Sequence, residues 1–184
     1  MSELPKVYVE PGAESRLKPV FMTGEVYEQA SRSMIIDCTD VLLYDRARRV
    51  VWLATRRSKP MQGLWVIGGR RKPGETPTQS VLRCFERETK VRLEPSRLVF
   101  LTENEYVWKD RAQAPQDVGC HAVARVFGVL VPDAEELQEM QRGLHPEEYD
   151  ASLGLQGFSR EGLVQASAHP ALIDLYDIAS EKLG

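Results

Sequence analysis

Residues Gly68 to Val91 read GGRRKPGETPTQSVLRCFERETKV, which places two glycines before a charged loop and a helix. Thr76 and Gln79 have the spacing of a capping box, and Pro77 stands in the first turn, where proline is favoured. We therefore expect a helix that begins after Thr76 and runs to about Lys90. A glycine turn, an acidic loop and a helix start at this spacing are typical of a phosphate and metal site.

The predicted helix carries an apolar stripe with one carboxylate at its edge. At about 100° per residue, the stripe consists of Val81, Leu82 and Phe85. Glu88 lies beside it, where a carboxylate is uncommon without a partner. Glu86 projects roughly 160° away from Glu88 on the same helical wheel, so it cannot act as a second ligand beside it. The site face of the helix therefore holds one carboxylate.

The same stretch resembles the Nudix hydrolase signature, G-x5-E-x7-R-E-U-x-E-E-x-G-U, in which U is aliphatic. The positions that match in register are Gly69, Glu75, Arg83, Phe85, Glu88 and Val91. Three positions depart: Cys84 and Arg87 replace glutamates, and Lys90 replaces the late glycine. The resemblance implies an α+β chain with the Nudix fold, an α/β/α sandwich around a central mixed sheet.

The flanks of the signature are similar to those of the GDP-mannose mannosyl hydrolase branch, whose signature is likewise reduced. The upstream residues that match are Arg56, Pro60, Gln62, Gly63 and Trp65, with Arg70 after the glycines. Downstream, residues 117–127 resemble the strand that carries the catalytic histidine of that branch, which falls on His121. The run from Trp65 to Gly68 is one residue shorter than the branch pattern. The resemblance covers about residues 50 to 131.

This branch implies hydrolysis of a nucleoside diphosphate sugar at the anomeric carbon, which releases a free sugar and a nucleoside diphosphate. One Mg²⁺, or Mn²⁺ in its place, stabilises the leaving diphosphate while a base activates water on the opposite face of the sugar. The implied roles are metal binding by the Gly68 carbonyl and Glu88, catalysis by His121, Arg70 and Arg83, substrate binding by Arg56, Arg70, Tyr106 and Trp108, and support by Glu75.

Two other functions compete with this hypothesis. In the first, the chain is a conventional pyrophosphatase for an ADP-sugar or a nucleotide, with the missing metal ligands supplied by Glu103, Glu105 or Asp117. In the second, it is a catalytically silent module that binds a nucleotide or a protein, and Arg87 occupies the vacated metal position as a built-in cation. Attack at phosphorus commonly uses two or three metal ions, which one glutamate can hardly hold.

Each singled-out residue also has an ordinary structural interpretation. A lone histidine in a strand, such as His121, is more often a hydrogen-bonded structural side chain. Arg83 and Arg87 taken singly are typical of solvated helix charges with local ion pairs. Cys84 is typical of a small packing residue, because no base close in sequence would activate its thiol. Tyr106 and Trp108 are typical of sheet residues that pack into the core.

Composition favours one domain with a sizeable core. The chain has 184 residues, of which 42% are hydrophobic and 28% charged, with a formal net charge of −3. This charge argues against nucleic acid or a membrane surface as a partner. The first residues contain no apolar run typical of a signal peptide or a membrane span. Cys38, Cys84 and Cys120 lack metal-finger spacing, which favours reduced thiols in the cytoplasm.

The chain divides into an N-terminal extension over residues 1–32 and a Nudix domain over residues 33–184. We expect a homodimer, with the extension as a candidate for its interface. Residues 1–20 are predicted to be irregular because prolines interrupt them. Hydrophobic patterning predicts helices over residues 25–31, 135–141 and 169–182, and strands over residues 33–44, 49–55, 97–108, 119–131 and 149–158.

Overall fold

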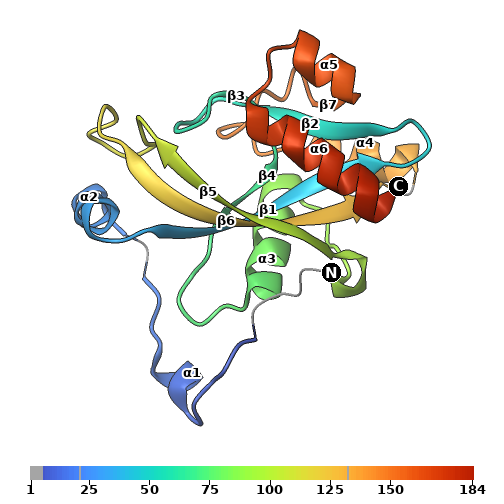
Figure 1. The fold of residues 1–184 in the computed structure, drawn as a ribbon. Helices are drawn as coiled ribbons and strands as arrows, with labels where there is room; N and C mark the ends of the chain where they lie inside the picture. Colours follow the sequence, from blue (N-terminus) through green and yellow to red (C-terminus); the bar gives the residue numbers. More distant parts are fainter. Residues whose placement is uncertain (1–5, 21, 132) are drawn as a thin grey trace.

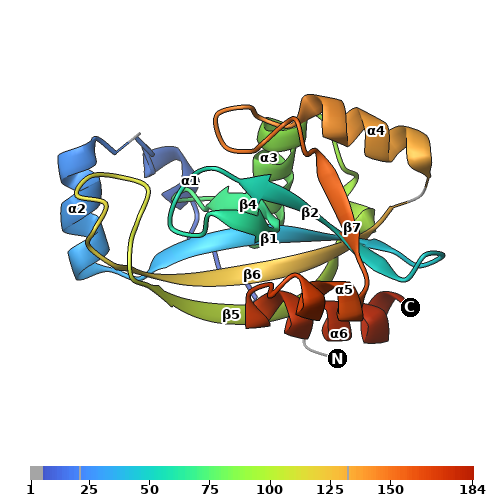
Figure 2. The same ribbon diagram turned by 90° about the horizontal axis from the view of Figure 1, so that it is seen from above.

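A seven-stranded mixed sheet lies between two layers of helices (Figures 1 and 2). The computed structural model describes residues 6–20, 22–131 and 133–184. The strands are β1 (Ile36–Asp45), β2 (Val50–Arg56), β3 (Gly63–Trp65), β4 (Ile67–Arg70), β5 (Val99–Trp108), β6 (Cys120–Leu130) and β7 (Leu155–Phe158). The helices are α1 (Ala13–Arg16), α2 (Gly24–Ser33), α3 (Pro77–Thr89), the 3-10 turn η1 (Pro95–Arg97), α4 (Ala134–Gly143), α5 (Arg160–Gln165) and α6 (Pro170–Leu183).

Strand β1 changes its antiparallel partner along its length, and this change opens the sheet. Its last residues, 43–45, pair with β2, whereas residues 38–41 pair with β4. On its other edge β1 runs parallel to β6 from Ile36 to Tyr44. β2 continues away from β1 to pair with β3 and β7. The sheet therefore splits beside residues 38–42 of β1, next to the two glycines of β4.

The two faces of the sheet bury separate apolar clusters. α3 and α4 cover one face, where Val41, Ile67 and Phe85 belong to one cluster. α6 covers the opposite face, where Leu42 and Leu175 belong to the other (Figure 2). The alternation of side chains along β1 explains this division, because successive residues point to opposite faces. The predicted three-layer α+β architecture is confirmed.

The predicted start of α3 is also confirmed. The Thr76 hydroxyl accepts a hydrogen bond from the Gln79 N–H at 3.2 Å, and the Gln79 side chain accepts one from the Thr76 N–H at 2.8 Å. The helix ends at Lys90, whose φ of 62° lies in the left-handed region. Glycine adopts this conformation without a steric cost, which explains why the signature has glycine there.

The structure corrects several details of the predicted elements. Residues 13–16 form one helical turn within the segment expected to be irregular. The strand expected over residues 149–158 is confined to β7, and Tyr149 instead forms an isolated bridge to Arg56. α5, β3 and β4 are too short for a periodic pattern to predict them. The division at residue 33 stays a prediction, and α2 ends at that residue.

Candidate functional site

Gly68 and Gly69 separate a carboxylate on one face of β4 from a guanidinium on the other. A Cβ on Gly68 would lie 2.0 Å from Oδ1 of Asp40, with which Gly68 pairs across the strands. A Cβ on Gly69 would lie 2.9 Å from Nη2 of Arg87 and 3.3 Å from Sγ of Cys84. The missing side chains therefore let both charged groups approach the backbone of β4.

The peptide groups of Gly68 face away from β1. The Arg71 N–H donates to the Asp37 carbonyl at 2.9 Å. Arg71 and Asp37 are therefore one of the hydrogen-bonded pairs between β4 and β1. In an antiparallel ladder these pairs alternate, so Gly69 bonds with Thr39 whereas Gly68 does not bond with Asp40. The Gly68 carbonyl, predicted to be a metal ligand, therefore points out from β1 at the split in the sheet.

Asp40 is a buried carboxyl at this split. It is 7% exposed, and burial raises its pKa to about 7, although the positive charge of Arg56 opposes that rise. Tyr149 lies close to the same charges. Burial and the negative charge of Glu88 raise the pKa of Tyr149, whereas Arg56 lowers it. Asp40, Arg56, Glu88 and Tyr149 thus form one electrostatic cluster beside Gly68, which we call the cleft cluster.

Glu88 is buried and bound to its neighbour Arg87. Its side chain is 2% exposed, whereas that of Arg87 is 49% exposed. Oε1 of Glu88 accepts hydrogen bonds from both Nε, at 2.7 Å, and Nη2 of Arg87. Oε2 of Glu88 is buried and accepts no hydrogen bond within the described part of the chain. The Arg87 guanidinium therefore compensates the charge of the carboxylate predicted to bind metal.

Glu75 and Arg83 form a clamp across the loop that follows β4. Nε of Arg83 donates to Oε1 of Glu75, and Nη2 donates to Oε2 at 2.8 Å and to the Arg70 carbonyl at 3.0 Å. Oε2 of Glu75 also accepts from the Lys72 N–H at 2.8 Å. Burial raises the pKa of Glu75, but these hydrogen bonds outweigh burial and lower the pKa. The clamp holds the loop that follows β4 against α3.

The Arg70 side chain packs against the N-terminal helix α2. Its Cζ lies 4.4 Å from the ring centroid of Tyr27, which is buried. Nη1 of Arg70 is buried and has no hydrogen-bond partner among the described residues. Arg56, by contrast, reaches the cleft cluster, and its Nη2 donates to Oγ of Ser58 at 3.0 Å.

His121 lies just beyond one end of the β1–β6 ladder, whereas Asp40 of the cleft cluster lies at the middle of the ladder. Asp40 pairs with Val126 in that ladder, so His121 lies five residues, or about 16 Å, further along β6. Its Nε2 is 2.9 Å from Oε1 of Glu105, although the alignment does not make a hydrogen bond. The structure therefore does not bring His121 together with Gly68 and Glu88.

The other candidate metal ligands are also dispersed. Glu103 lies 2.8 Å from Nε of Arg125, and Glu105 contacts His121. Asp117 lies in the loop between β5 and β6. Across residues 6–20, 22–131 and 133–184, no three His, Cys, Asp or Glu side chains gather in a way that could hold a metal ion.

Tyr106 and Trp108, the predicted base-stacking residues, stack on each other. Their ring centroids are 5.1 Å apart with an interplanar angle of 19°, and Trp65 packs edge-on against both. His169 packs against the same rings from the start of α6. Tyr106 is only 8% exposed, whereas Trp108 is partly buried. Trp108 is therefore the member of this pair with surface left for a base.

The residues present do not fit a resident Mg²⁺ ion. Mg²⁺ requires near-octahedral oxygen coordination, with one or two carboxylates, waters and substrate phosphates. Oε2 of Glu88 and the Gly68 carbonyl are suitable oxygens. However, Cys84 and Arg87 stand at the other ligand positions of the helix, and the Arg87 guanidinium is already paired with Glu88. A fixed positive charge beside the one carboxylate on the site face of the helix repels a divalent cation.

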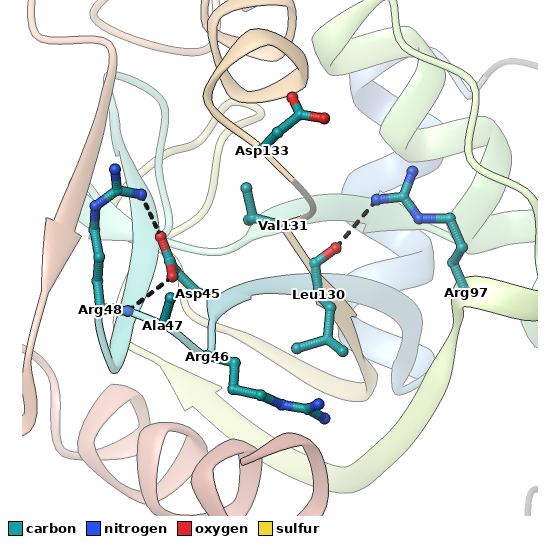
Figure 3. A pocket seen from close by; sticks show the side chains of 8 residues that line it. All are labelled: Asp45, Arg46, Ala47, Arg48, Arg97, Leu130, Val131 and Asp133. Atoms are coloured by element: carbon teal, nitrogen blue, oxygen red, sulfur yellow. Dashed lines mark hydrogen bonds and ion pairs between the residues drawn. The ribbon is translucent and has the colours of Figure 1, made fainter.

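A hollow of about 540 Å³ lies at the far end of β1 (Figure 3). Three arginines line it, and each is engaged with the protein itself. Arg48 pairs with Asp45, Arg97 donates to the Leu130 carbonyl, and Arg46 donates to the Leu183 carbonyl. Asp45 is five residues along β1 from Asp40, or about 16 Å, so this hollow is separate from the cleft cluster.

The comparisons with known proteins agree with this fold. The NUDIX domain model matches residues 34–163, which is most of the chain. The chain belongs to the Nudix family. Membership of this hydrolase family indicates a hydrolase, and Nudix hydrolases generally use divalent metal ions. No curated protein matches the chain in sequence.

Solved Nudix structures share the fold at low sequence identity. A MutT NUDIX hydrolase from Burkholderia pseudomallei is 17% identical with a TM-score of 0.57, over 79% of this chain and 98% of that one. A C. elegans Ap4A hydrolase is 13% identical with a TM-score of 0.53, over 82% and 100%. The E. coli dihydroneopterin triphosphate pyrophosphohydrolase is 17% identical with a TM-score of 0.53, over 78% and 92%. These likenesses show the fold.

Sequence reasoning missed two members of the cleft cluster. Asp40 carries a detectable signal, because it interrupts the apolar row of Cys38, Leu42 and Tyr44 on one face of a predicted strand. Tyr149 carries none, since it reaches the cluster through the bridge to Arg56. The three cysteines are free thiols. Within the described residues, no helix combines the length and apolarity needed to cross a bilayer.

Proposed function

We propose that this Nudix protein hydrolyses nucleoside diphosphate sugars by attack of water at the anomeric carbon. The observation that carries this proposal is Asp40, a buried carboxyl with a pKa raised to about 7, next to Gly68 and within the field of Arg56. A base with a pKa near the working pH accepts a proton most effectively. Attack at carbon also needs fewer cations than attack at phosphorus, which agrees with the sparse carboxylates of α3.

In the proposed reaction, the Asp40 carboxylate accepts a proton from water as the water oxygen bonds to the anomeric carbon. The bond between that carbon and the diphosphate oxygen breaks, and the diphosphate leaves with the electron pair. The products are a free sugar of inverted configuration and a nucleoside diphosphate. Arg56 is the arginine of the cleft cluster, and its permanently charged guanidinium is suited to hold the diphosphate oxygens.

The role of base was first predicted for His121, and that assignment stays a prediction. Its distance from Gly68 along β6 favours Asp40 instead. The roles predicted for Arg70 and Arg83 are better supported as positioning roles, because Arg70 packs on Tyr27 and Arg83 clamps Glu75. Trp108 is the candidate for stacking on the base. The homodimer and the cytoplasmic location also stay predictions, whereas the ion pair of Arg87 with Glu88 argues against the predicted binding of Mg²⁺ or Mn²⁺.

Product analysis tests the proposal. The purified protein is incubated with a panel of nucleoside diphosphate sugars, with Mg²⁺ and separately with EDTA, and the nucleotides are resolved by ion exchange. We expect a nucleoside diphosphate and a free sugar, with turnover lost in Asp40→Asn and retained in His121→Ala. A nucleoside monophosphate would establish attack at phosphorus. Loss of turnover in His121→Ala, with nucleotide binding intact, would return the role of base to His121.

A second candidate is a nucleotide-binding module without turnover. The ion pair between Arg87 and Glu88 supports it, since the helix carboxylate is engaged by a protein cation. This candidate predicts that nucleotides bind although no sugar nucleotide is cleaved in the same panel. The panel with EDTA therefore separates the two candidates, provided that binding is measured alongside by calorimetry.

A further inference from the structure

We propose that the Arg87 guanidinium takes the place of the metal ion in this site, so that the protein binds a diphosphate without a divalent cation. This inference deepens the proposed function, because it rests on a diphosphate binding beside Gly68. It concerns how the diphosphate is held, and it applies equally to a hydrolase and to a binding module. Its test therefore measures binding and does not depend on turnover.

The position of Arg87 supports this replacement. The signature has a glutamate there, and the structure places the guanidinium against Gly69, where a Cβ would lie 2.9 Å from Nη2. Nε and Nη2 both donate to Oε1 of Glu88. A positive group thus contacts the carboxylate that would otherwise bind a cation.

Arg87 keeps donors for a ligand after it has paired with Glu88. A guanidinium has five N–H donors, and two hydrogen bonds to Glu88 leave three. The side chain is 49% exposed, so the ion pair with Glu88 does not enclose it. A guanidinium binds phosphate oxygens through two parallel hydrogen bonds, which gives a fixed geometry without an ion. Glu88 holds the guanidinium in place from its buried side.

Calorimetry with ADP and with inorganic pyrophosphate, in EDTA and in Mg²⁺, tests the binding mode. We expect both probes to bind in EDTA, with a dissociation constant that Mg²⁺ changes less than about threefold. Arg87→Gln should weaken binding in EDTA by about tenfold or more, which corresponds to about 1.4 kcal/mol. The matched control is Arg92→Gln, since Arg92 is exposed and pairs with Glu86 away from the site.

A second measurement follows the metal directly by electron paramagnetic resonance of Mn²⁺. We expect no Mn²⁺ binding by the natural protein, and new Mn²⁺ binding by Arg87→Glu, which restores the signature carboxylate. Because Arg87→Gln leaves Glu88 buried without its partner, the double variant Arg87→Gln/Glu88→Gln removes both charges and protects the fold. Mn²⁺ binding by the natural protein, or ADP binding that EDTA abolishes, would overturn the inference. Loss of turnover alone would leave these binding results unaffected.

Discussion

At the scale of single residues, the proposed chemistry of this site depends on one buried carboxyl and one partly exposed guanidinium. Asp40 owes its raised pKa to burial, since the charged form loses the solvation of water. Arg87 stays close to the backbone because Gly69 has no side chain. The approach of these two side chains requires no backbone strain in β4. The proposed base and the proposed cation thus lie on opposite faces of one short strand.

The pH dependence of activity is expected to follow Asp40. The base acts as a carboxylate, so kcat/KM should rise with pH through about 7 and level off above it. Asp40→Asn should lower kcat/KM by at least about 100-fold and remove this limb of the profile. The profile is measured with the substrate that the product panel identifies. A limb that persists in Asp40→Asn would assign the titration to another group.

Asp40 should also affect stability in a pH-dependent way. Its pKa is raised in the folded state from 3.8 to about 7, so its contribution is fully present below about 4 and is lost as the pH rises through 7. Asp40→Asn should therefore gain stability relative to the natural protein between pH 5 and pH 8, by up to about 4 kcal/mol. Urea unfolding at several pH values measures this difference, and a constant difference would contradict it.

At the scale of elements, α3 and the loop before it act as one unit. The capping box fixes the first turn, and the bond from Arg83 to the Arg70 carbonyl ties the helix to the end of β4. The loop over residues 71–76 therefore has a defined path, which sets the position of the glycines. Glu75 and Arg83 therefore hold this loop and the end of β4 through hydrogen bonds within the protein.

Breaking the clamp should destabilise this unit. Arg83→Ala leaves Glu75 without its main donor and should lower the free energy of unfolding by about 1–3 kcal/mol. In the natural protein the lowered pKa of Glu75 means that this contribution is fully present above its unfolded pKa of 4.5 and is lost progressively as the pH falls from 4.5 through the lower pKa of the folded state. Denaturation at pH 7 and pH 4 measures both effects. An equal loss at both pH values would argue against the ion pair as the cause.

The end of α3 offers a prediction of the opposite sign. Lys90 has a φ of 62°, which costs a residue with a Cβ about 1 kcal/mol or more. Lys90→Gly removes this cost but increases the entropy of the unfolded chain, so we expect a net gain of roughly 0.5 kcal/mol. Thermal unfolding checks the sign. A clear loss of stability would show that the Lys90 bond to the Arg87 carbonyl outweighs the backbone strain.

At the scale of the whole molecule, the split in the sheet decides where the site lies. β1 pairs with β2 at one end and with β4 at the other, so the cleft cluster forms where the two halves diverge. α2 lies beside the end of β6 (Figure 1). Its Tyr27 ring contacts Arg70 of β4, the strand of the glycines. The N-terminal helix is therefore coupled to the same face as Asp40.

Removing the Tyr27 contact tests this coupling. Tyr27→Ala should cost about 3 kcal/mol through the lost aromatic burial, whereas Tyr27→Leu should cost about 1 kcal/mol through the lost contact with the Arg70 guanidinium. We expect a single unfolding transition in both variants, as measured by urea denaturation. A separate early transition would show that α2 unfolds independently of the sheet.

The sequence by itself determined the family, the α3 capping box, the apolar stripe and the single carboxylate at Glu88. These features depend on residue spacing along one helix or strand, and local geometry relates spacing directly to position. Asp40 was within reach of the same reasoning, because a carboxylate interrupts an apolar row.

Only the tertiary structure decided which charged groups meet. Asp40, Arg56, Glu88 and Tyr149 come from four separate segments, and the divergence of β2 and β4 from β1 brings them together. The same register placed His121 away from the glycines. Strand register and sheet divergence depend on packing between distant segments, so no local spacing in the chain encodes them.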